Sequence, residues 1–359
     1  MQFLSDNAAS VHPAIWDALK AADAPDSPYD GDGLSNALDQ RFSDLFGKPC
    51  AVLWVATGTA ANCLALATMV QPHGGIVCHE EAHIEMDEGG APGFYLHGAK
   101  LLLAKGDGAK LSPDAIRAVV DPIRDDVHQV QPHAISITQA SEYGRAYRAD
   151  EIAAISTLAR DRGLRLHMDG ARFANAAAFL DVSAAEAAGD VDALSFGCVK
   201  NGGMSAEAIV FFDPALADVV RYRRKRAGHL QSKGRYLAAQ LLAMIEDDLW
   251  LDDARAANAA AQAIAHYGAD RLMPAARRFD LGNYNYPAAM ACAKSLDIIA
   301  AVGTKAIEAH VTGLAHGFAQ GLLDLGLSVA GGVPGPHIGG IVSVGEFGSG
   351  GHDTTDDPR

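Results

Sequence analysis

The chain of 359 residues is short of cysteine, of positive charge and of long apolar runs, and each shortage excludes a class of protein. Its five cysteines are scattered and form no CxxC pair, which supports neither a disulfide framework nor a zinc site and is typical of a reducing cytoplasm. Lysine and arginine number 29 against 44 acidic residues, and the formal net charge of −15 disfavours nucleic acid or an anionic membrane as the main partner. No stretch approaches the ~18 apolar residues of a membrane span, and the N-terminus has no basic segment followed by an apolar one. We therefore expect a cytoplasmic protein.

What is present is typical of a globular enzyme, with 49% hydrophobic and 20% charged residues and enough length for two domains. From about residue 50, short apolar runs alternate with helical patterns. The predicted strands are 51–55, 75–78, 100–103, 134–138, 165–168, 193–196 and 208–212. The predicted helices include 59–69, 113–120, 149–162 and 184–188, and a helical segment runs from 215 to about 265. This alternation predicts an α/β fold with a mainly parallel sheet covered on both faces by helices.

Lys200 and Asp169 each follow one of these apolar runs. Their side chains are therefore expected at the carboxyl ends of two strands, where open α/β sheets bind ligands. Taken singly, they would be interpreted as a surface lysine and a strand-end aspartate. Together they suit pyridoxal 5′-phosphate (PLP), because the amine forms a Schiff base with the cofactor aldehyde and the carboxylate keeps the pyridine nitrogen protonated.

The run Thr57-Gly58-Thr59-Ala-Ala-Asn62 follows the first predicted strand and opens a helix. Small residues let backbone N–H groups approach an anion, and the helix N-terminus adds a partial positive charge. The run is therefore a candidate phosphate site, with an ordinary strand-to-helix turn as the alternative.

His79 and His83 follow the second predicted strand. An imidazole at a strand end can stack on a flat cofactor ring or transfer protons, and either histidine is a candidate, with a plain loop residue as the alternative. The HxxxH spacing beside carboxylates also resembles a metal site. The glycine-rich stretch at 89–93 argues against one long helix carrying the ligands, so we expect no metal.

Arg172 lies three residues after Asp169, where a guanidinium could bind a carboxylate or phosphate through two hydrogen bonds. Gln139, Ser141 and Glu142 end another predicted strand and would add polar groups to the same rim. The basic residues at 221–226 form a cluster that could be functional, and the alternative is that they are simply the solvated face of a helix. A Ser-His-Asp hydrolase is disfavoured because the chain has no G-x-S-x-G elbow.

In this order the motifs resemble those of the PLP-dependent threonine aldolases, in the β-eliminating lyase group of fold-type I enzymes. The matching stretches are Ser5-Asp-Asn7, Tyr29 to Asp32, Gly58 to Asn62, Ala82 to Glu88, Ile137 to Glu142, His167 to Phe173 and Phe196 to Gly202. They extend over residues 1 to about 274. The resemblance implies a fold-type I architecture, with an N-terminal arm and helix at 1–40, a large PLP-binding domain at 41–245, and a helical connector with a smaller C-terminal α/β domain at 246–359.

The resemblance also implies roles for single residues. Lys200 would bind the cofactor covalently, Asp169 would pair with its pyridine nitrogen and His83 would stack on its ring. The other cofactor-binding residues are expected among Gly58, Thr59, Arg172, Lys225 and Lys233. Ser5, Tyr29 and Arg172 would contact the substrate, and His128 matches a family histidine near the substrate hydroxyl. The implied reaction is reversible cleavage of β-hydroxy-α-amino acids such as threonine, allo-threonine or phenylserine to glycine and an aldehyde, with His83 or His128 as the base.

Two segments depart from the family pattern. The loop Tyr29-Asp-Gly-Asp32 differs from the family's Tyr-Gly-Asp-Asp. From about residue 275 the segments 277–286 and 330–337 resemble instead the C-terminal part of class V aminotransferases and cysteine desulfurases, and no late arginine for the substrate carboxylate is recognisable. A chimera, a truncation and a divergent enzyme all fit this. The polar tail at 347–359 is expected to be disordered.

Two alternatives therefore stay open beside the aldolase. One is another fold-type I PLP enzyme, namely a class V aminotransferase, a desulfurase or a β-lyase. The other is a PLP-binding protein with little activity. In each case the expected partner is an amino acid substrate, a small molecule, and the family implies a homodimer or homotetramer in which Tyr29 and part of the basic segment reach a neighbour's cofactor.

Overall fold

The computed structural model describes residues 5–269, 294, 296–330, 332–335, 342 and 344. Contacts divide the chain into two units, Met1–Ala289 and Met290–Arg359. The segment 277–286 and the tail 347–359 singled out above lie outside the described residues. The predicted domain limits at 40 and 245 remain predictions.

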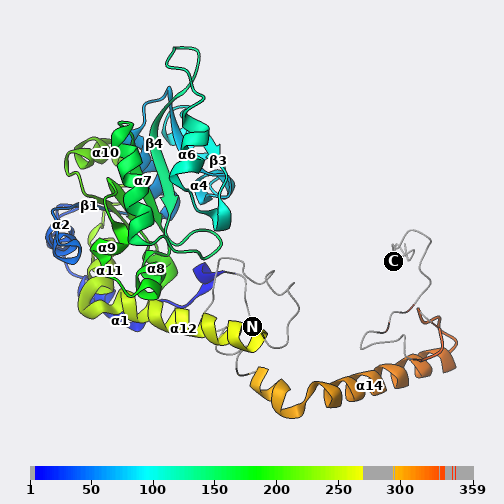
Figure 1. Ribbon diagram of the computed structural model, residues 1–359. Helices are drawn as coiled ribbons and strands as arrows, with labels where there is room; N and C mark the ends of the chain where they lie inside the picture. Colours follow the sequence, from blue (N-terminus) through cyan, green and yellow to red (C-terminus); the bar gives the residue numbers. More distant parts are fainter. Residues whose placement is uncertain are drawn as a thin grey trace, which may run out of the picture. The chain divides into compact units, whose positions relative to one another are not determined.

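A seven-stranded sheet forms the centre of the first unit (Figure 1). Its strands are β1 Ala51–Val55, β2 Gly74–His79, β3 Lys100–Ala104, β4 Gln131–Thr138, β5 Arg165–Gly170, β6 Ala193–Phe196 and β7 Glu207–Phe211. They lie in the order β1-β7-β6-β5-β4-β2-β3. Strand β7 is antiparallel to both neighbours, and the other neighbouring pairs are parallel. The mainly parallel sheet is thus confirmed, and all seven predicted strands are present.

Helices cover both faces of this sheet. They are α1 Pro13–Ala21, α2 Gly33–Phe46, α3 Gly58–Met69, α4 His83–Met86, α5 Ala91–Tyr95, α6 Pro113–Val120, α7 Ala149–Asp161, α8 Phe173–Leu180, α9 Ala184–Ala188, α10 Ala215–Arg226, α11 Arg235–Ile245 and α12 Leu249–Ala269. Short 3₁₀ turns add η1 Asp6–Ala8, η2 Asp107–Ala109, η3 Val199–Asn201 and η4 Glu246–Asp248.

The side chains of each strand alternate between two apolar cores. In β1, Val52 and Trp54 join the core that contains α2, α7, α8 and α11, whereas Leu53 and Val55 join the core beneath α3 and α10. Burial on both faces explains why β1 is a continuous apolar run rather than an alternating one. The same alternation places Asp169 on the α3 side, because its neighbour Met168 belongs to the other core.

The helical prediction for 215–265 is only partly right, since three helices replace one segment. Gly228 has a φ of 83°, a left-handed conformation that ends α10. Gly234 precedes α11, where a Cβ atom would lie 2.1 Å from the Trp54 ring and from the Tyr29 carbonyl oxygen. The break at 227–234 is therefore required by close packing against β1.

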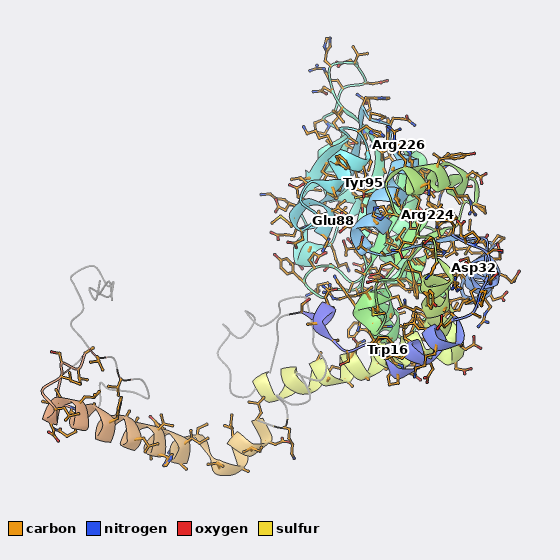
Figure 2. All side chains as sticks on the ribbon, turned by 180° about the vertical axis from the view of Figure 1, so that it is seen from behind. Trp16, Asp32, Glu88, Tyr95, Arg224 and Arg226 are labelled. Carbon is orange, nitrogen blue, oxygen red and sulfur yellow. The ribbon has the colours of Figure 1, made fainter. Side chains whose placement is uncertain are left out.

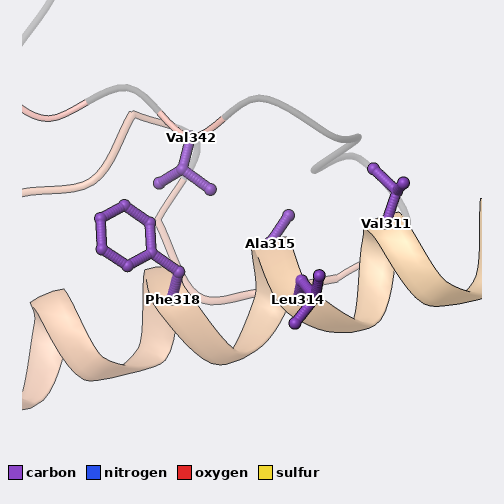
Figure 3. A pocket seen from close by; sticks show the side chains of 5 residues that line it. All are labelled: Val311, Leu314, Ala315, Phe318 and Val342. Atoms are coloured by element: carbon purple, nitrogen blue, oxygen red, sulfur yellow. The ribbon is translucent and has the colours of Figure 1, made fainter.

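The second unit contains α14, Thr304–Asp324. Ala319 packs with Val329, and one face of the helix lines a shallow apolar hollow with Val342 (Figure 3). Within the described residues, no single helix is long and apolar enough to cross a membrane; 296–302 and 304–324 meet that measure only as a pair, and the pair is bent by 84°.

Candidate active site

The strand order brings four residues singled out in the sequence to one edge of the sheet. Neighbouring strands β6, β5, β4 and β2 are parallel, so the residues that follow them share the carboxyl edge. Lys200 follows β6, Asp169 lies near the end of β5, Glu142 follows β4 and His83 follows β2. The lysine–aspartate pair predicted from the sequence is thus joined by a second carboxyl group and an imidazole.

Asp169 is the most firmly held group of this edge. Its side chain is buried, and both carboxylate oxygens accept hydrogen bonds. Oδ2 accepts from Asn62 Nδ2 at 2.8 Å, and Oδ1 accepts from the backbone N–H of Ala171 at 3.0 Å. These donors fix the carboxylate, which can then face a cationic ring nitrogen.

His83 opens α4 and is paired with a buried carboxylate. Its Nδ1 lies 3.3 Å from Oε1 of Glu88, whose side chain is withdrawn from solvent and labelled in Figure 2. Because a carboxylate only accepts, Nδ1 carries the proton and Nε2 is left for a ligand or a proton. The Glu88 hydrogen bond is the main cause of a raised His83 pKa, Asp169 adds to it, and burial and Lys200 oppose it.

His79 is excluded as the competing imidazole by its own contacts. Its Nε2 is 3.0 Å from the Gly106 carbonyl oxygen, and its Nδ1 accepts the Glu81 N–H at 3.0 Å. Both ring nitrogens therefore hold the loop after β2 in place. Within the part of the chain that the structure describes, no group of three or more His, Cys, Asp or Glu residues could hold a metal ion.

Lys200 lies in the turn η3, and the buried Glu207 side chain is hydrogen-bonded to the backbone just before this lysine. Glu207 Oε2 accepts the N–H of Cys198 at 2.5 Å and that of Val199 at 3.4 Å. Burial raises the pKa of Glu207 to about 7, against the lowering effect of these amides and of Lys200. The short helix η1 contacts η3, so the N-terminal arm lies beside the lysine turn.

Glu142 is a further titratable group at this edge, for which the sequence predicted a position beside the site but no role. Burial raises its pKa, and Asp169 raises it further, while His83, Arg172 and Lys200 lower it. The side chain therefore lies within electrostatic reach of the whole edge.

The N-terminus of α3 has the geometry of an anion site. Thr57 is the N-cap, with its Oγ1 accepting from the Ala60 N–H at 3.2 Å. The space beside the Gly58 α carbon is open to a distance of 4 Å. The first N–H groups of this 12-residue helix can thus receive a phosphate. With Asp169 for a ring nitrogen and Lys200 for an aldehyde, the donor set fits PLP.

Arg172 follows β5 and is held by the N-terminal arm. Its Nε donates to Oδ2 of the buried Asp6 at 2.9 Å, and Nη2 lies 3.4 Å from Oδ1. Ser5 is the adjacent residue and caps η1, with its Oγ accepting the Asn7 N–H at 3.2 Å. Ser5 and Arg172, which the resemblance predicts to contact the substrate together, are linked in the structure through Asp6.

Tyr29, Lys225 and Lys233 form a separate group. The Lys225 ammonium lies 4.7 Å from the centre of the Tyr29 ring, and Tyr29 pairs with Lys233 through a backbone bridge. Within the described ranges, no hydrogen bond joins either lysine to Gly58 or Thr59.

The basic cluster is not simply a solvated helix face. Arg224 is buried against the Trp54 ring, with 4.5 Å between guanidinium and ring centre, and pairs with Asp30 (Figure 2 labels the arginine).

His128 is a predicted site residue that the fold of one chain places away from the site. It lies exposed on the turn before β4, where its N–H donates to Asp126 Oδ1 at 2.9 Å. This turn is at the amino edge of the sheet, opposite the edge that holds His83. Its role as a base remains a prediction.

The site also contains residues that sequence reasoning gave no role. Asn62, Glu88, Asp6 and Glu207 each hold one of the predicted groups. Asn62, Glu88 and Asp6 belong to stretches that resemble the family's motifs, which was the available signal. Glu207 lies outside these stretches and carried none, because its contacts with Cys198 and Val199 follow only from the fold.

A model of the β-eliminating lyase family matches residues 2–284. Two relatives are low-specificity L-threonine aldolases, one from a Pseudomonas species and one from Pseudomonas aeruginosa. Each is 44% identical over 272 residues, which make up 75% of this chain and 78% of the relative.

Solved structures give the same picture. The threonine aldolase of Leishmania major is 26% identical, with a TM-score of 0.71 over 75% of this chain and 79% of that one. Aspartate aminotransferase from Thermus thermophilus is 13% identical, with a TM-score of 0.58 over 73% and 70%, and shares the fold.

Proposed function

The chain belongs to the β-eliminating lyase family, and from this membership we propose that it is a PLP-dependent threonine aldolase. It cleaves β-hydroxy-α-amino acids of the threonine, allo-threonine and phenylserine type to glycine and an aldehyde, and catalyses the reverse reaction. Two relatives named as low-specificity L-threonine aldolases, at 44% identity, support this reaction over transamination.

The observation that carries the proposal is the shared edge of Lys200, Asp169 and His83. Lys200 would bind the cofactor through its amine, and Asp169 would hold the pyridine nitrogen in its protonated form. The N–H groups at Gly58 and Thr59 would hold the phosphate. PLP, when bound, supplies an electron sink for the pair of electrons left at the substrate α carbon.

The chain's own residues would handle the protons and the orientation. Arg172, fixed by Asp6, would bind the substrate carboxylate beside Ser5. His83 would take the β-hydroxyl proton at Nε2, directly or through water, as the Cα–Cβ bond breaks. A proton returned to the α carbon completes glycine, and the former β carbon leaves as the aldehyde carbonyl.

The test is incubation of purified protein with L-threonine, L-allo-threonine and L-phenylserine, following aldehyde and glycine together with the spectrum. We expect an absorbance band above 400 nm in the wild type, its loss in Lys200→Ala, and stoichiometric aldehyde and glycine. Lys20→Ala, at an exposed lysine of α1, is the control.

Other outcomes identify the alternatives. Pyruvate, sulfide or a transaminated product would indicate another fold-type I reaction. A cofactor band without product from any of the three substrates would indicate a binding protein, and a wild type without the band would overturn the proposal.

We further propose a cytoplasmic homodimer or homotetramer, in which the segment containing Tyr29 and Lys225 faces a neighbour's cofactor. The contact between the Lys225 ammonium and the Tyr29 ring keeps these two residues together, as that role requires.

A further inference from the structure

One asparagine joins two buried carboxylates at the centre of the site. Asn62 Nδ2 donates to Asp169 Oδ2 at 2.8 Å and to Glu88 Oε1 at 3.0 Å. The same Glu88 oxygen lies 3.3 Å from His83 Nδ1. Four side chains from α3, α4, β5 and the loop before α5 therefore form one continuous chain of hydrogen bonds.

The chemistry fixes the orientation of the amide. Both neighbours of Nδ2 are carboxylate oxygens, which accept only, so an NH₂ group must face them. Its two hydrogens match the two acceptors. Asn62 Oδ1 is buried and has no hydrogen-bond partner among the described residues. Leaving a buried carbonyl oxygen unpaired destabilises the fold, so stability alone does not explain an asparagine at this position.

We propose that Asn62 and Glu88 are positioning residues: the Asn62 amide ties the cofactor-facing carboxylate of Asp169 to Glu88, and Glu88 holds the His83 imidazole as the proton acceptor. The ring-nitrogen partner and the base are then one hydrogen-bonded unit. The catalytic meaning of this unit rests on the proposed function, whereas the coupling itself is a property of the protein alone.

Four charged groups face His83 and determine its protonation. Glu88, Asp169 and Glu142 favour the imidazolium, and the Lys200 ammonium opposes it. Glu88 alone is hydrogen-bonded to the ring, so it has the largest effect. Asn62 modulates this effect, because its N–H donors partly neutralise the charges of Glu88 and Asp169.

The two positioning residues therefore act on His83 with opposite sign. Loss of the Glu88 charge in Glu88→Gln removes the main support of the imidazolium and lowers the His83 pKa. Loss of the amide donors in Asn62→Ala leaves both carboxylates less neutralised and raises it. A residue that merely filled space would produce neither pattern.

The decisive experiment is a titration of the His83 ring by NMR in the cofactor-free full chain, with the signal assigned by its loss in His83→Asn. We expect a shift to lower pH in E88Q and to higher pH in N62A. In the N62A/E88Q double variant the effect of N62A should largely vanish, because the coupling passes through Glu88. Thr68→Ala, which removes one hydrogen-bonding group from the same helix away from the site, is the control and should leave the titration unchanged.

The design guards against misfolding and separates the two hypotheses. Asn62→Asp keeps the size of the side chain and adds negative charge, so it should also raise the His83 pKa if N62A does not fold. An unchanged titration in E88Q, or an N62A effect that is equal with and without E88Q, would overturn the coupling. If the titrations shift as expected but the acidic limb of the kcat/KM profile for threonine does not follow them, the coupling stands and the assignment of His83 as the base fails.

Discussion

The buried Asp6 and the half-buried Arg172 form an ion pair although 166 positions separate them in the chain, with Arg172 Nε 2.9 Å from Asp6 Oδ2. The pair fastens the N-terminal arm to the turn between β5 and α8. It also fixes the plane of a guanidinium that stands three residues after Asp169. A residue of the arm therefore orients the group proposed to bind the substrate carboxylate.

Asp6→Asn should raise KM for threonine by about tenfold, which corresponds to about 1.4 kcal/mol, with a smaller change in kcat. The neutral amide cannot hold the guanidinium through two charge-assisted hydrogen bonds, so the arginine loses its fixed orientation. Steady-state kinetics measures the split. Asp17→Asn, in an exposed ion pair with Lys20, is the control. Equal KM values in the wild type and the Asp6 variant would show that the pair serves the arm alone.

The sheet and its ligand edge could be predicted from the sequence because buried parallel strands leave a local signal. The strands β1 (Ala-Val-Leu-Trp-Val) and β6 (Ala-Leu-Ser-Phe) consist mostly of apolar residues, and their predicted limits coincide with the observed ones. Lys200 and Asp169 follow such runs, and the position of strand ends at one edge then follows from the fold class.

The supporting residues could not be predicted, because their contacts are distant in sequence. Asn62 lies 107 positions from Asp169, and only the packing of α3 on the β5 face makes them neighbours. The break in the 215–265 helix has the same origin, since Gly234 is required by the Trp54 ring of β1. For His128 the resemblance and the structure differ. The resemblance predicts a place near the substrate, whereas the fold of one chain puts His128 at the amino edge of the sheet.

The buried Glu207 carboxyl should make the stability of the protein depend on pH. Its pKa of about 7 in the folded state is above the ordinary glutamate value of 4.5, so the stabilising protonated form is fully present below about pH 4.5 and is lost as the pH rises through 7. Glu207→Gln cannot lose a proton. Relative to the wild type it should therefore gain up to about 3 kcal/mol of unfolding free energy between pH 4.5 and pH 8.

Urea unfolding of both proteins across this range measures the difference. Glu308→Gln, at an exposed position of α14, should follow the wild type throughout. A pH-independent difference between wild type and E207Q would mean that the carboxyl stays ionised in the fold.

Asp30 should be important for stability through Arg224. The Arg224 guanidinium is buried, donates to the Trp54 carbonyl oxygen at 3.2 Å and is neutralised by Asp30. Asp30→Asn leaves this charge without its partner and should cost about 3 kcal/mol of unfolding free energy. Arg221 contacts the same carboxylate at 3.8 Å from an exposed position, so Arg221→Gln should cost less than about 1 kcal/mol. Comparable losses in the two variants, measured by denaturant titration, would contradict the distinction.

A composite site predicts complementation between two inactive variants. If Tyr29 acts on the cofactor of a neighbouring subunit, a mixed dimer of Lys200→Ala and Tyr29→Ala chains contains one intact site, built from Lys200 of one chain and Tyr29 of the other. Random mixing makes half of the dimers mixed, so about a quarter of the wild-type aldolase activity should return. Asp169 lies on β5 and Lys200 follows the neighbouring strand β6 of the same chain, so the pair Lys200→Ala with Asp169→Ala should restore nothing. Absence of recovery in the first mixture, with exchange of subunits verified by differently tagged chains, would place Tyr29 in the site of its own chain.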